Sequence, residues 1–161
     1  MTQSCETITP AAFWRALGER AIGACLVTAQ SADGPKGFLG LSAAHISADP
    51  ARMSVSVGGA SSALPGILES RHFAINILSQ EDQALAEIFG GKGEKPFEPG
   101  KWDRLATGAP VLKCALAVFD CALEKVIELD GTALLIGQVQ ALSAKDDGAP
   151  LIYFRGGFLA D

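Results

Sequence analysis

The sequence predicts a mainly β fold with short helices, an antiparallel barrel of about seven strands and three helices. Turn signals at residues 33–35 (Asp-Gly-Pro) and 130–131 (Asp-Gly) each separate two apolar segments that suit the strands of a hairpin. Residues 52–57 alternate apolar and polar side chains, as a strand with one buried face does. A doubly wound parallel sheet would need a long helix after each strand, and the second half of the chain has no such helices.

Length and composition indicate one folded domain, and we expect a single unit over residues 1–161. The chain is 48% hydrophobic, which is enough to fill a core. Its net charge is −5 and Lys and Arg form no cluster, so we expect neither nucleic acid nor a membrane as partner. No apolar stretch reaches the ~18 residues of a membrane span. The start shows no signal peptide, so we expect a cytoplasmic protein.

Cysteines and histidines do not predict a metal site. The four cysteines form no C-x-x-C pair and the chain has only two histidines, so the usual zinc-binding pattern is absent. Cys114 and Cys121 lie seven residues apart and would face opposite sides of one strand, which disfavours a disulfide between them. His72 opens a predicted strand, where we expect a packing or surface role.

Three helices are predicted from capping signals and apolar spacing. The first follows Thr9, a suitable N-cap, and is expected to end at Gly23. The second covers roughly residues 61–70. The third follows Ser79, which forms a capping box with Asp82, and its apolar side leads to a closing glycine.

The strands are predicted from short apolar runs bounded by turn residues. In residues 52–57, Met53, Val55 and Val57 point to one side of the strand. Residues 72–78 show a similar alternation. The other strands are expected at residues 24–29, from Lys36 onward, in one or two pieces over 112–129, at 132–142 and at 151–154.

Familiar catalytic motifs are missing from the sequence. It has no G-x-x-x-x-G-K-[ST] phosphate loop, no G-x-G-x-x-G after a strand, and no G-x-S-x-G elbow. The carboxylates are scattered and suggest no acid/base pair, so no catalytic protein residue is predicted. A chain with so few reactive groups is expected to use the chemistry of a bound cofactor.

Two segments could hold such a cofactor. Gly58 to Ser62 lies between a strand and a short helix, where backbone N–H groups and hydroxyls attract phosphate. Gly37 to Ser47 is rich in small residues that would let the backbone reach the edge of a flat ring. The alternatives are an ordinary N-cap for the first segment and close strand packing for the second.

Several segments match the motifs of a known family in order and spacing. They are residues 13–18 with 23–28, residues 37–50, residues 73–78 (Phe-Ala-Ile-Asn-Ile-Leu), residues 108–112 (Gly-Ala-Pro-Val-Leu) and residues 150–155 (Pro-Leu-Ile-Tyr-Phe-Arg). Together they resemble the flavin reductase-like family, the FMN-binding split barrels, over almost the whole chain. The resemblance implies an antiparallel split β-barrel that works as a homodimer.

The same resemblance implies a function. Members use NADH or NADPH to reduce FMN or FAD, which then supplies a partner flavin-dependent monooxygenase. The mechanism is hydride transfer from nicotinamide to flavin, with proximity and orientation carrying most of the rate. Carried over to this sequence, the cofactor-binding residues are Phe38, Leu39, Leu41, Ser42, Ala43, Ala44, His45, Ser47, Ser61, Ser62 and, on the nicotinamide side, Thr132.

Departures from the family pattern leave alternatives open. Leu39 and Leu41 stand where hydroxyl or amide side chains are common, and Ser62 stands where an Arg is common. Missing phosphate contacts could come from Arg52, Lys92 or Lys95. Thr132 replaces a His associated with the nicotinamide site and cannot titrate near neutral pH. An FMN-binding protein without NAD(P)H turnover, a flavin-dependent reductase of another acceptor, and a domain without flavin are therefore kept as alternatives.

Aromatic residues outside these motifs are assigned simpler roles. The glycine-rich loop over residues 90–100 is either a lid with Phe97 reaching toward the flavin or a plain surface excursion. Trp14 and Trp102 are expected in the core or at an interface.

Overall fold

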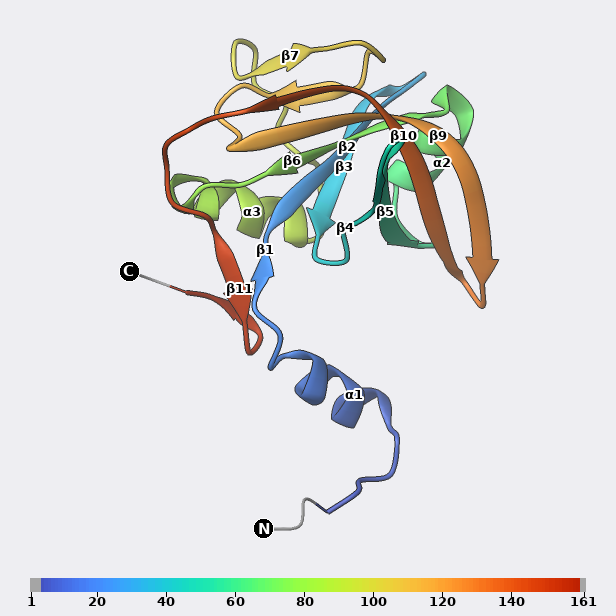
Figure 1. The fold of residues 1–161 in the computed structure, drawn as a ribbon, viewed down its shortest axis with the longest axis vertical. Helices are drawn as coiled ribbons and strands as arrows, with labels where there is room; N and C mark the ends of the chain where they lie inside the picture. The colour runs from blue at the N-terminus through green and yellow to red at the C-terminus, as the bar shows by residue number, and fades with distance from the viewer. Residues whose placement is uncertain (1–3, 160–161) are drawn as a thin grey trace.

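The computed structural model describes residues 4–159, and its main feature is one seven-stranded antiparallel sheet (Figure 1). The strands run in the order β3-β2-β6-β9-β10-β5-β4. Their bounds are β2 Cys25–Ser31, β3 Gly34–Gly40, β4 Ala44–Ala48, β5 Ala51–Gly58, β6 His72–Ile77, β9 Ala117–Leu129 and β10 Thr132–Ala144. The prediction of a mainly β, antiparallel fold is therefore confirmed.

The two edges of this sheet are joined by the chain but not by a strand ladder. β3 and β4 are the outermost strands, and they have no registered pairing with each other. Residues 41–43 connect them directly. The described structure is thus an open, curved sheet rather than a closed barrel. We call residues 41–48, the connection and β4, the seam.

Two small sheets accompany the main one. The first consists of β1 (Ile22–Gly23), β11 (Ile152–Phe154) and β12 (Gly157–Phe158), and the second of β7 (Trp102–Arg104) and β8 (Pro110–Leu112). The predicted run over residues 112–129 is split between β8 and β9. The strands β1, β4, β7 and β12 were not predicted, because they have between two and five residues and carry little alternation.

All three helices are present, with one wrong boundary. α2 spans Ala63–Ser70, and α3 (Gln83–Gly90) follows a single 3₁₀ turn that begins with the predicted Ser79–Asp82 capping box. α1 spans Pro10–Leu17, and its Thr9 hydroxyl accepts a hydrogen bond from the Ala12 amide. The expected end at Gly23 was wrong, because the Gly18 carbonyl accepts a hydrogen bond from the Arg155 amide as the chain turns toward β1.

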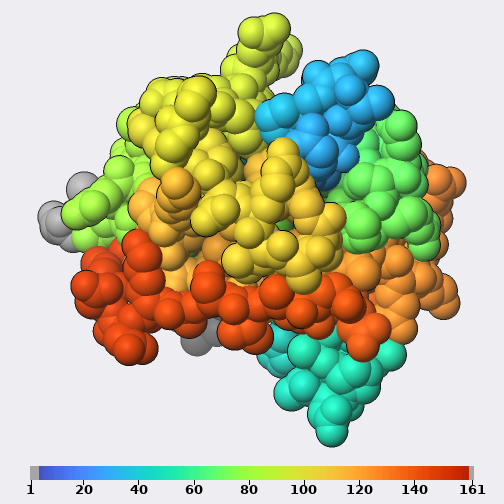
Figure 2. Space-filling model, turned by 90° about the horizontal axis from the view of Figure 1, so that it is seen from above, coloured from blue at the N-terminus to red at the C-terminus, as the bar shows by residue number. Residues whose placement is uncertain are grey.

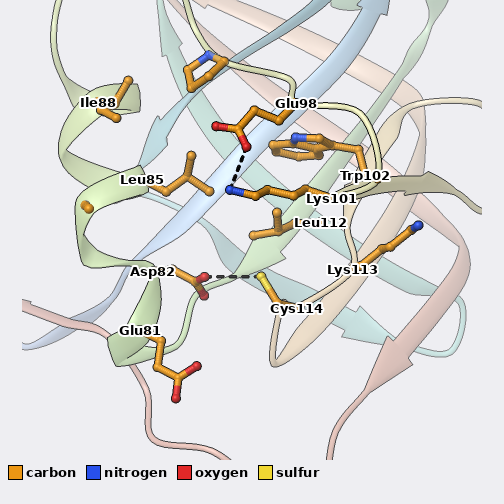
Figure 3. Close-up of a pocket in the computed structure, with 13 residues that line it drawn as sticks. Glu81, Asp82, Leu85, Ile88, Glu98, Lys101, Trp102, Leu112, Lys113 and Cys114 are labelled. Carbon is orange, nitrogen blue, oxygen red and sulfur yellow. Dashed lines mark hydrogen bonds and ion pairs between the residues drawn. The ribbon is translucent and has the colours of Figure 1, made fainter.

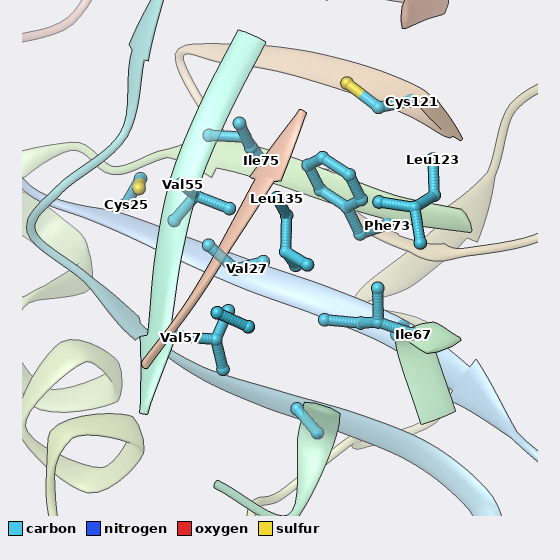
Figure 4. Packing of buried hydrophobic residues seen from close by; sticks show 13 residues of the cluster. Cys25, Val27, Val55, Val57, Ile67, Phe73, Ile75, Cys121, Leu123 and Leu135 are labelled. Carbon is cyan, nitrogen blue, oxygen red and sulfur yellow. The ribbon is translucent and has the colours of Figure 1, made fainter. Parts of the chain in front are cut away.

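The core lies on both faces of the central strands. One cluster packs between the strands and α2, and Figure 4 shows Val27, Val55 and Leu135 converging beside Phe73. The alternation predicted for residues 52–57 is confirmed, because Val55 and Val57 are fully buried. A second cluster on the opposite face includes Phe89 of α3 and residues of β8. The helices α2 and α3 are thereby fixed on opposite faces of the β2–β3 hairpin.

The N-terminal arm stands apart from this core. α1 contains no buried residue and extends away from the main sheet in Figure 1. Phe13 and Trp14 stack edge to face with ring centroids 5.5 Å apart, yet they are 54% and 66% exposed. Trp14 is therefore not a core residue within one chain. None of the helices in residues 4–159 has the length and apolar character that a membrane crossing requires.

Candidate functional site

A cleft of about 490 Å³ brings together segments that are far apart in the sequence. One wall is the end of β3, a second is the loop that leads into α2, and the third is the end of α3 with the following glycine-rich loop. We call it the α2–α3 cleft. Figure 2 shows the β2–β3 hairpin in blue between α2 in green and the segment after α3 in yellow. The predicted residues Phe38, Leu39, Ser61 and Ser62 all line this cleft.

The close approach of β3 to α3 depends on a glycine. A Cβ atom added at Gly37 would lie 2.8 Å from a ring carbon of Phe89, which is closer than side chains tolerate. Phe89 is 2% exposed and closes the base of the cleft, while Leu39 of the same strand packs against the second core cluster. The apolar part of the cleft is therefore rigid and set by core packing.

Polar groups gather at the α2 end of the cleft. The Ser61 hydroxyl accepts a hydrogen bond from the Ala63 amide at 3.3 Å and so serves as a cap. Ser62 occupies the formal N-cap position, but its hydroxyl makes no capping bond and its side chain is exposed. The Leu64 amide is also bonded, to the Ser61 carbonyl at 3.3 Å, and Pro65 has no N–H. The Ser62 hydroxyl is therefore the donor that this end of the cleft can offer to an anion.

Two lysines of the glycine-rich loop border the same cleft but differ in their bonding. Lys95 donates to the carbonyls of Ile88 and Gly91 at the end of α3, and so caps that helix. Lys92 is exposed and forms no hydrogen bond or ion pair within residues 4–159. Arg52, the other candidate, is paired with Glu124 at 2.6 Å and does not line the cleft. Of the three, Lys92 is the cation available to a ligand.

The seam residues stabilise the sheet instead of lining the cleft. The Ser42 hydroxyl accepts a hydrogen bond from the Ser56 amide at 2.9 Å and donates to the Ser56 carbonyl at 3.4 Å. Leu41 packs on one core cluster and Ala43 on the other, and Ala44 pairs with Ser54. The seam begins next to Phe38 and Leu39, but its side chains are used within the fold.

Ser47 and His45 lie farther along the seam. The Ser47 hydroxyl donates to the Pro50 carbonyl at 2.6 Å and closes the turn between β4 and β5. His45 is exposed on β4, opposite Met53. Neither residue lines the α2–α3 cleft. The sequence grouped them with the ring-binding segment because it does not show that the chain bends into a second strand after residue 43.

Thr132 lies beside the α2 loop, although it is remote in sequence. It is the exposed first residue of β10 and is in register with Gly58. Next to it, the Gly59 amide donates to the Gly131 carbonyl at 2.7 Å, and a Cβ at Gly59 would approach that oxygen to 2.9 Å. The turn before β10 and the loop before α2 are therefore adjacent. Thr132 lies next to this contact but not in the cleft itself.

The glycine-rich loop is anchored by an aromatic residue. Phe97 packs against Trp102 with centroids 4.7 Å apart and against Phe89 at 5.5 Å. It lines a neighbouring cavity and not the α2–α3 cleft. The residues that the loop contributes to the cleft are Gly91, Lys92, Gly93 and Lys95. In the sequence, the run Gly-Gly-Lys-Gly was the pattern that could have indicated this wall of the cleft.

Comparison with known proteins identifies the family of this chain. The profile of the family described as "Flavin reductase like domain" matches residues 17–160. "FMN reductase (NADH) RutF 2" of Rhizobium rhizogenes is 33% identical over 131 residues, covering 80% of this chain and 76% of that protein. The reductase component of a flavin-dependent trigonelline monooxygenase of Acinetobacter baylyi is 33% identical over 144 residues. This chain spans only 46% of the length of the A. baylyi protein.

Solved structures agree with the sequence relationship. The flavin reductase PheA2 is 29% identical and superposes with a TM-score of 0.86, with 96% of this chain and 100% of that chain covered. A flavin reductase structure from Haemophilus somnus has a TM-score of 0.90 at 22% identity, which supports the fold alone. The predicted family is confirmed, and the names of these relatives agree with the predicted enzyme class, a flavin oxidoreductase. The chain belongs to the flavin reductase like domain family.

Proposed function

We propose that this chain reduces FMN, or loosely held FAD, with NADH or NADPH as hydride donor, and that the α2–α3 cleft holds the flavin. The observation that carries the proposal is the meeting of Phe38, Leu39, Ser61 and Ser62 in one cleft. Its volume of about 490 Å³ lies in the range of small-molecule sites. Apolar residues line one part and donors the other, which matches a flat ring joined to a phosphate.

Different residues of the cleft would bind different parts of the flavin. Ser62 and Lys92 would hold the phosphate, and Ser61 keeps the start of α2 in place. Phe38 and Leu39 would contact the apolar part of the ring. Bound flavin supplies the acceptor for a hydride. No acid or base of the protein is required, so positioning and exclusion of water are the contributions of the chain.

The nicotinamide side is assigned to the turn before β10. Thr132 is exposed next to the Gly59–Gly131 contact, where its hydroxyl can donate a hydrogen bond but cannot change charge near neutral pH. The absence of a histidine at this position is the reason to keep a second candidate, an FMN-binding protein without NAD(P)H turnover.

We also propose that the chain forms a homodimer and adopts a complete split barrel. The exposed Phe13 and Trp14 pair on α1 is an apolar surface that one chain leaves uncovered. A second copy is the partner that we propose for it, with Trp14 as an interface residue. Wild-type protein should then sediment as a dimer, and the Trp14→Glu variant as a monomer. A wild type that sediments as a monomer would contradict the proposal.

The downstream partner is proposed from the relatives. Two are named as reductase parts of flavin-dependent monooxygenases, the A. baylyi protein and the subunit HsaB of Rhodococcus jostii, which is 29% identical. We propose that this chain likewise supplies reduced flavin to a monooxygenase. Its four free cysteines support the expected cytoplasmic location, where thiols stay reduced.

Steady-state oxidation of NADH and of NADPH with added FMN or FAD tests the proposed activity. Turnover that depends on both the protein and added flavin would support a reductase and identify its donor. Flavin binding without turnover with either donor would favour the second candidate.

A further inference from the structure

A second cavity lies on the other side of α3 and plays no part in the proposed flavin site. It has a volume of about 540 Å³ and is formed between the start of α3, residues 96–101, and the small sheet of β7 and β8. We call it the Trp102 cleft (Figure 3). It shares no residue with the α2–α3 cleft.

Apolar side chains form most of the walls of the Trp102 cleft. Leu85 and Ile88 project from α3, and Leu112 and Trp102 lie opposite them (Figure 3). Ile88 is 48% exposed, so the cleft opens to solvent at this edge. A flat apolar molecule would bury this surface with the walls already in place, and burial would contribute about 25 cal/mol per Å².

The far wall is fixed by bonds that do not involve a ligand. Trp102 is in register with Leu112, and the Leu112 amide donates to the buried Asn76 side chain at 2.8 Å. The Trp102 ring also packs against Phe97. The aromatic face is therefore held in place before any ligand binds, which lowers the entropy cost of binding.

The polar groups of the cleft favour a hydroxyl over a charged group. Asp82 is occupied, because its carboxylate accepts from the Ser79 amide at 2.9 Å and from the Cys114 thiol at 3.3 Å. Lys101 and Glu98 form an exposed ion pair at 2.8 Å beside the apolar walls. A hydroxyl can donate to the carboxylate and accept from the amine of such a pair.

The charge of the lining disfavours an anion. The cleft is lined by the acidic residues Glu81, Asp82 and Glu98 and by the basic residues Lys101 and Lys113. The excess of one negative charge would oppose a carboxylate, and Lys101 is already paired with Glu98. Burial and the neighbouring Asp82 raise the pKa of the Cys114 thiol, so the site is suited to reversible binding and not to covalent capture.

We propose that the Trp102 cleft is a second ligand site, for a neutral aromatic molecule with one hydroxyl group, that is, a phenol. The ring lies between the α3 side chains Leu85 and Ile88 and the Trp102 wall. The hydroxyl bonds to the Lys101–Glu98 pair. This site is independent of the proposed flavin function.

Nuclear magnetic resonance of the two tryptophan side chains tests this proposal on the intact protein. The indole N–H signals of Trp14 and Trp102 are assigned with a Trp14→Phe variant. Titration with 4-methylphenol should shift the Trp102 signal saturably and leave the Trp14 signal unchanged. Shifts that never saturate, or that affect both signals equally, would overturn the proposal.

Two analogues and two variants sharpen the test. Binding should weaken by about tenfold for 4-methylbenzoate and for 4-methylcyclohexanol, a difference of about 1.4 kcal/mol in each case. Ala84→Leu, at an exposed helix position that lines the cleft, should abolish the shift without unfolding the protein. Gln83→Leu, on the same helix but outside the cleft, should retain it.

Equal affinity for the carboxylate analogue, or retained binding in Ala84→Leu, would contradict the assignment. FMN binding measured on the same samples separates the two proposals. Loss of phenol binding with normal FMN binding would refute only the second site, and the reverse result would refute only the flavin site.

Discussion

The seam and the α2–α3 cleft carry side chains of the same kinds, yet they use them differently. In the seam, the Ser42 hydroxyl is bonded to the backbone of β5 and the Ser47 hydroxyl to the backbone of the turn between β4 and β5. In the cleft, the Ser62 hydroxyl and the Lys92 amine have no partner within residues 4–159. Polar groups bonded within the fold stabilise it, while exposed unbonded groups can bind a ligand without first breaking a bond. The comparison therefore separates seam residues that support the site from cleft residues that bind.

The largest expected effect is on the phosphate end of the cleft. Ser62→Asp would place a negative charge where we expect the FMN phosphate, and the dissociation constant should rise at least about thirtyfold, or ~2 kcal/mol. Titration calorimetry or quenching of FMN fluorescence measures this. Ser143→Asp, an exposed serine of β10 outside the cleft, is the matched control and should bind FMN normally. Equal affinity of both variants would show that the phosphate lies elsewhere.

Two lysines of one loop offer a second contrast. Lys92→Gln should weaken FMN binding by about fivefold, or ~1 kcal/mol, and should lower its salt dependence, because a free cation is lost. Lys95→Gln should instead lower stability by about 0.5 kcal/mol, because Lys95 caps the carbonyl end of α3. Denaturation by urea and FMN titration on both variants check this. A larger loss of FMN affinity in Lys95→Gln would reverse the assignment.

In the seam, the expected effect is on stability. Ser42→Ala removes the bonds to Ser56 and should lower the free energy of unfolding by about 1 kcal/mol. Ser62→Ala should leave stability within about 0.5 kcal/mol of wild type, as exposed positions do. Urea unfolding of the two variants measures the difference. Equal destabilisation by the two variants would remove the distinction between the seam and the cleft.

The cysteine next to the seam should be the least reactive. The Cys25 thiol is buried and donates to the Gly40 carbonyl, and burial raises its pKa to about 12. Burial does the same for Cys121, with the Asp120 charge as the lesser cause. At pH 8, iodoacetamide should modify the exposed Cys5 and spare these two, as peptide mass mapping will show. Rapid labelling of Cys25 would mean that the strands beside the seam open.

The same thiols predict a dependence of stability on pH. Their folded pKa values lie above the ordinary value of 9.0, so the folded state holds these protons more tightly than the unfolded state. Stability from this source is complete below pH 9 and falls as the pH rises toward 12. Urea midpoints measured between pH 8 and 10.5 should fall, and Cys25→Ala should show a shallower decline.

Much of the fold was predictable because it depends on local patterns. The alternation in residues 52–57, the turn at 130–131 and the Ser79–Asp82 capping box each correspond to an observed element. The end of α1 was not predictable, because it depends on a hydrogen bond between Gly18 and Arg155, 137 positions apart along the numbered chain. The open form of the sheet was not predictable for a similar reason, since it depends on whether the edge strands β3 and β4 pair with each other.

The candidate site was predicted as a set of segments but not as a division of roles. Motif order indicated both Phe38–Leu39 and Ser61–Ser62, which lie together in the cleft. In sequence, the serines of the seam look equivalent to those of the cleft. Only the structure shows that the amide of Ser56, fourteen residues after Ser42, donates to the Ser42 hydroxyl. Hydroxyl availability depends on such long-range contacts, which single-sequence patterns do not encode.

An anaerobic visible spectrum of the protein with added FMN, recorded before and after NADH and then NADPH, tests the central claim most directly. We expect the oxidised flavin band to disappear at catalytic protein concentration, and to disappear much more slowly with Ser62→Asp at limiting FMN. A band that persists with both donors, while FMN is bound, would contradict the proposed reductase activity. Equal rates for wild type and Ser62→Asp would contradict the proposed place of the phosphate.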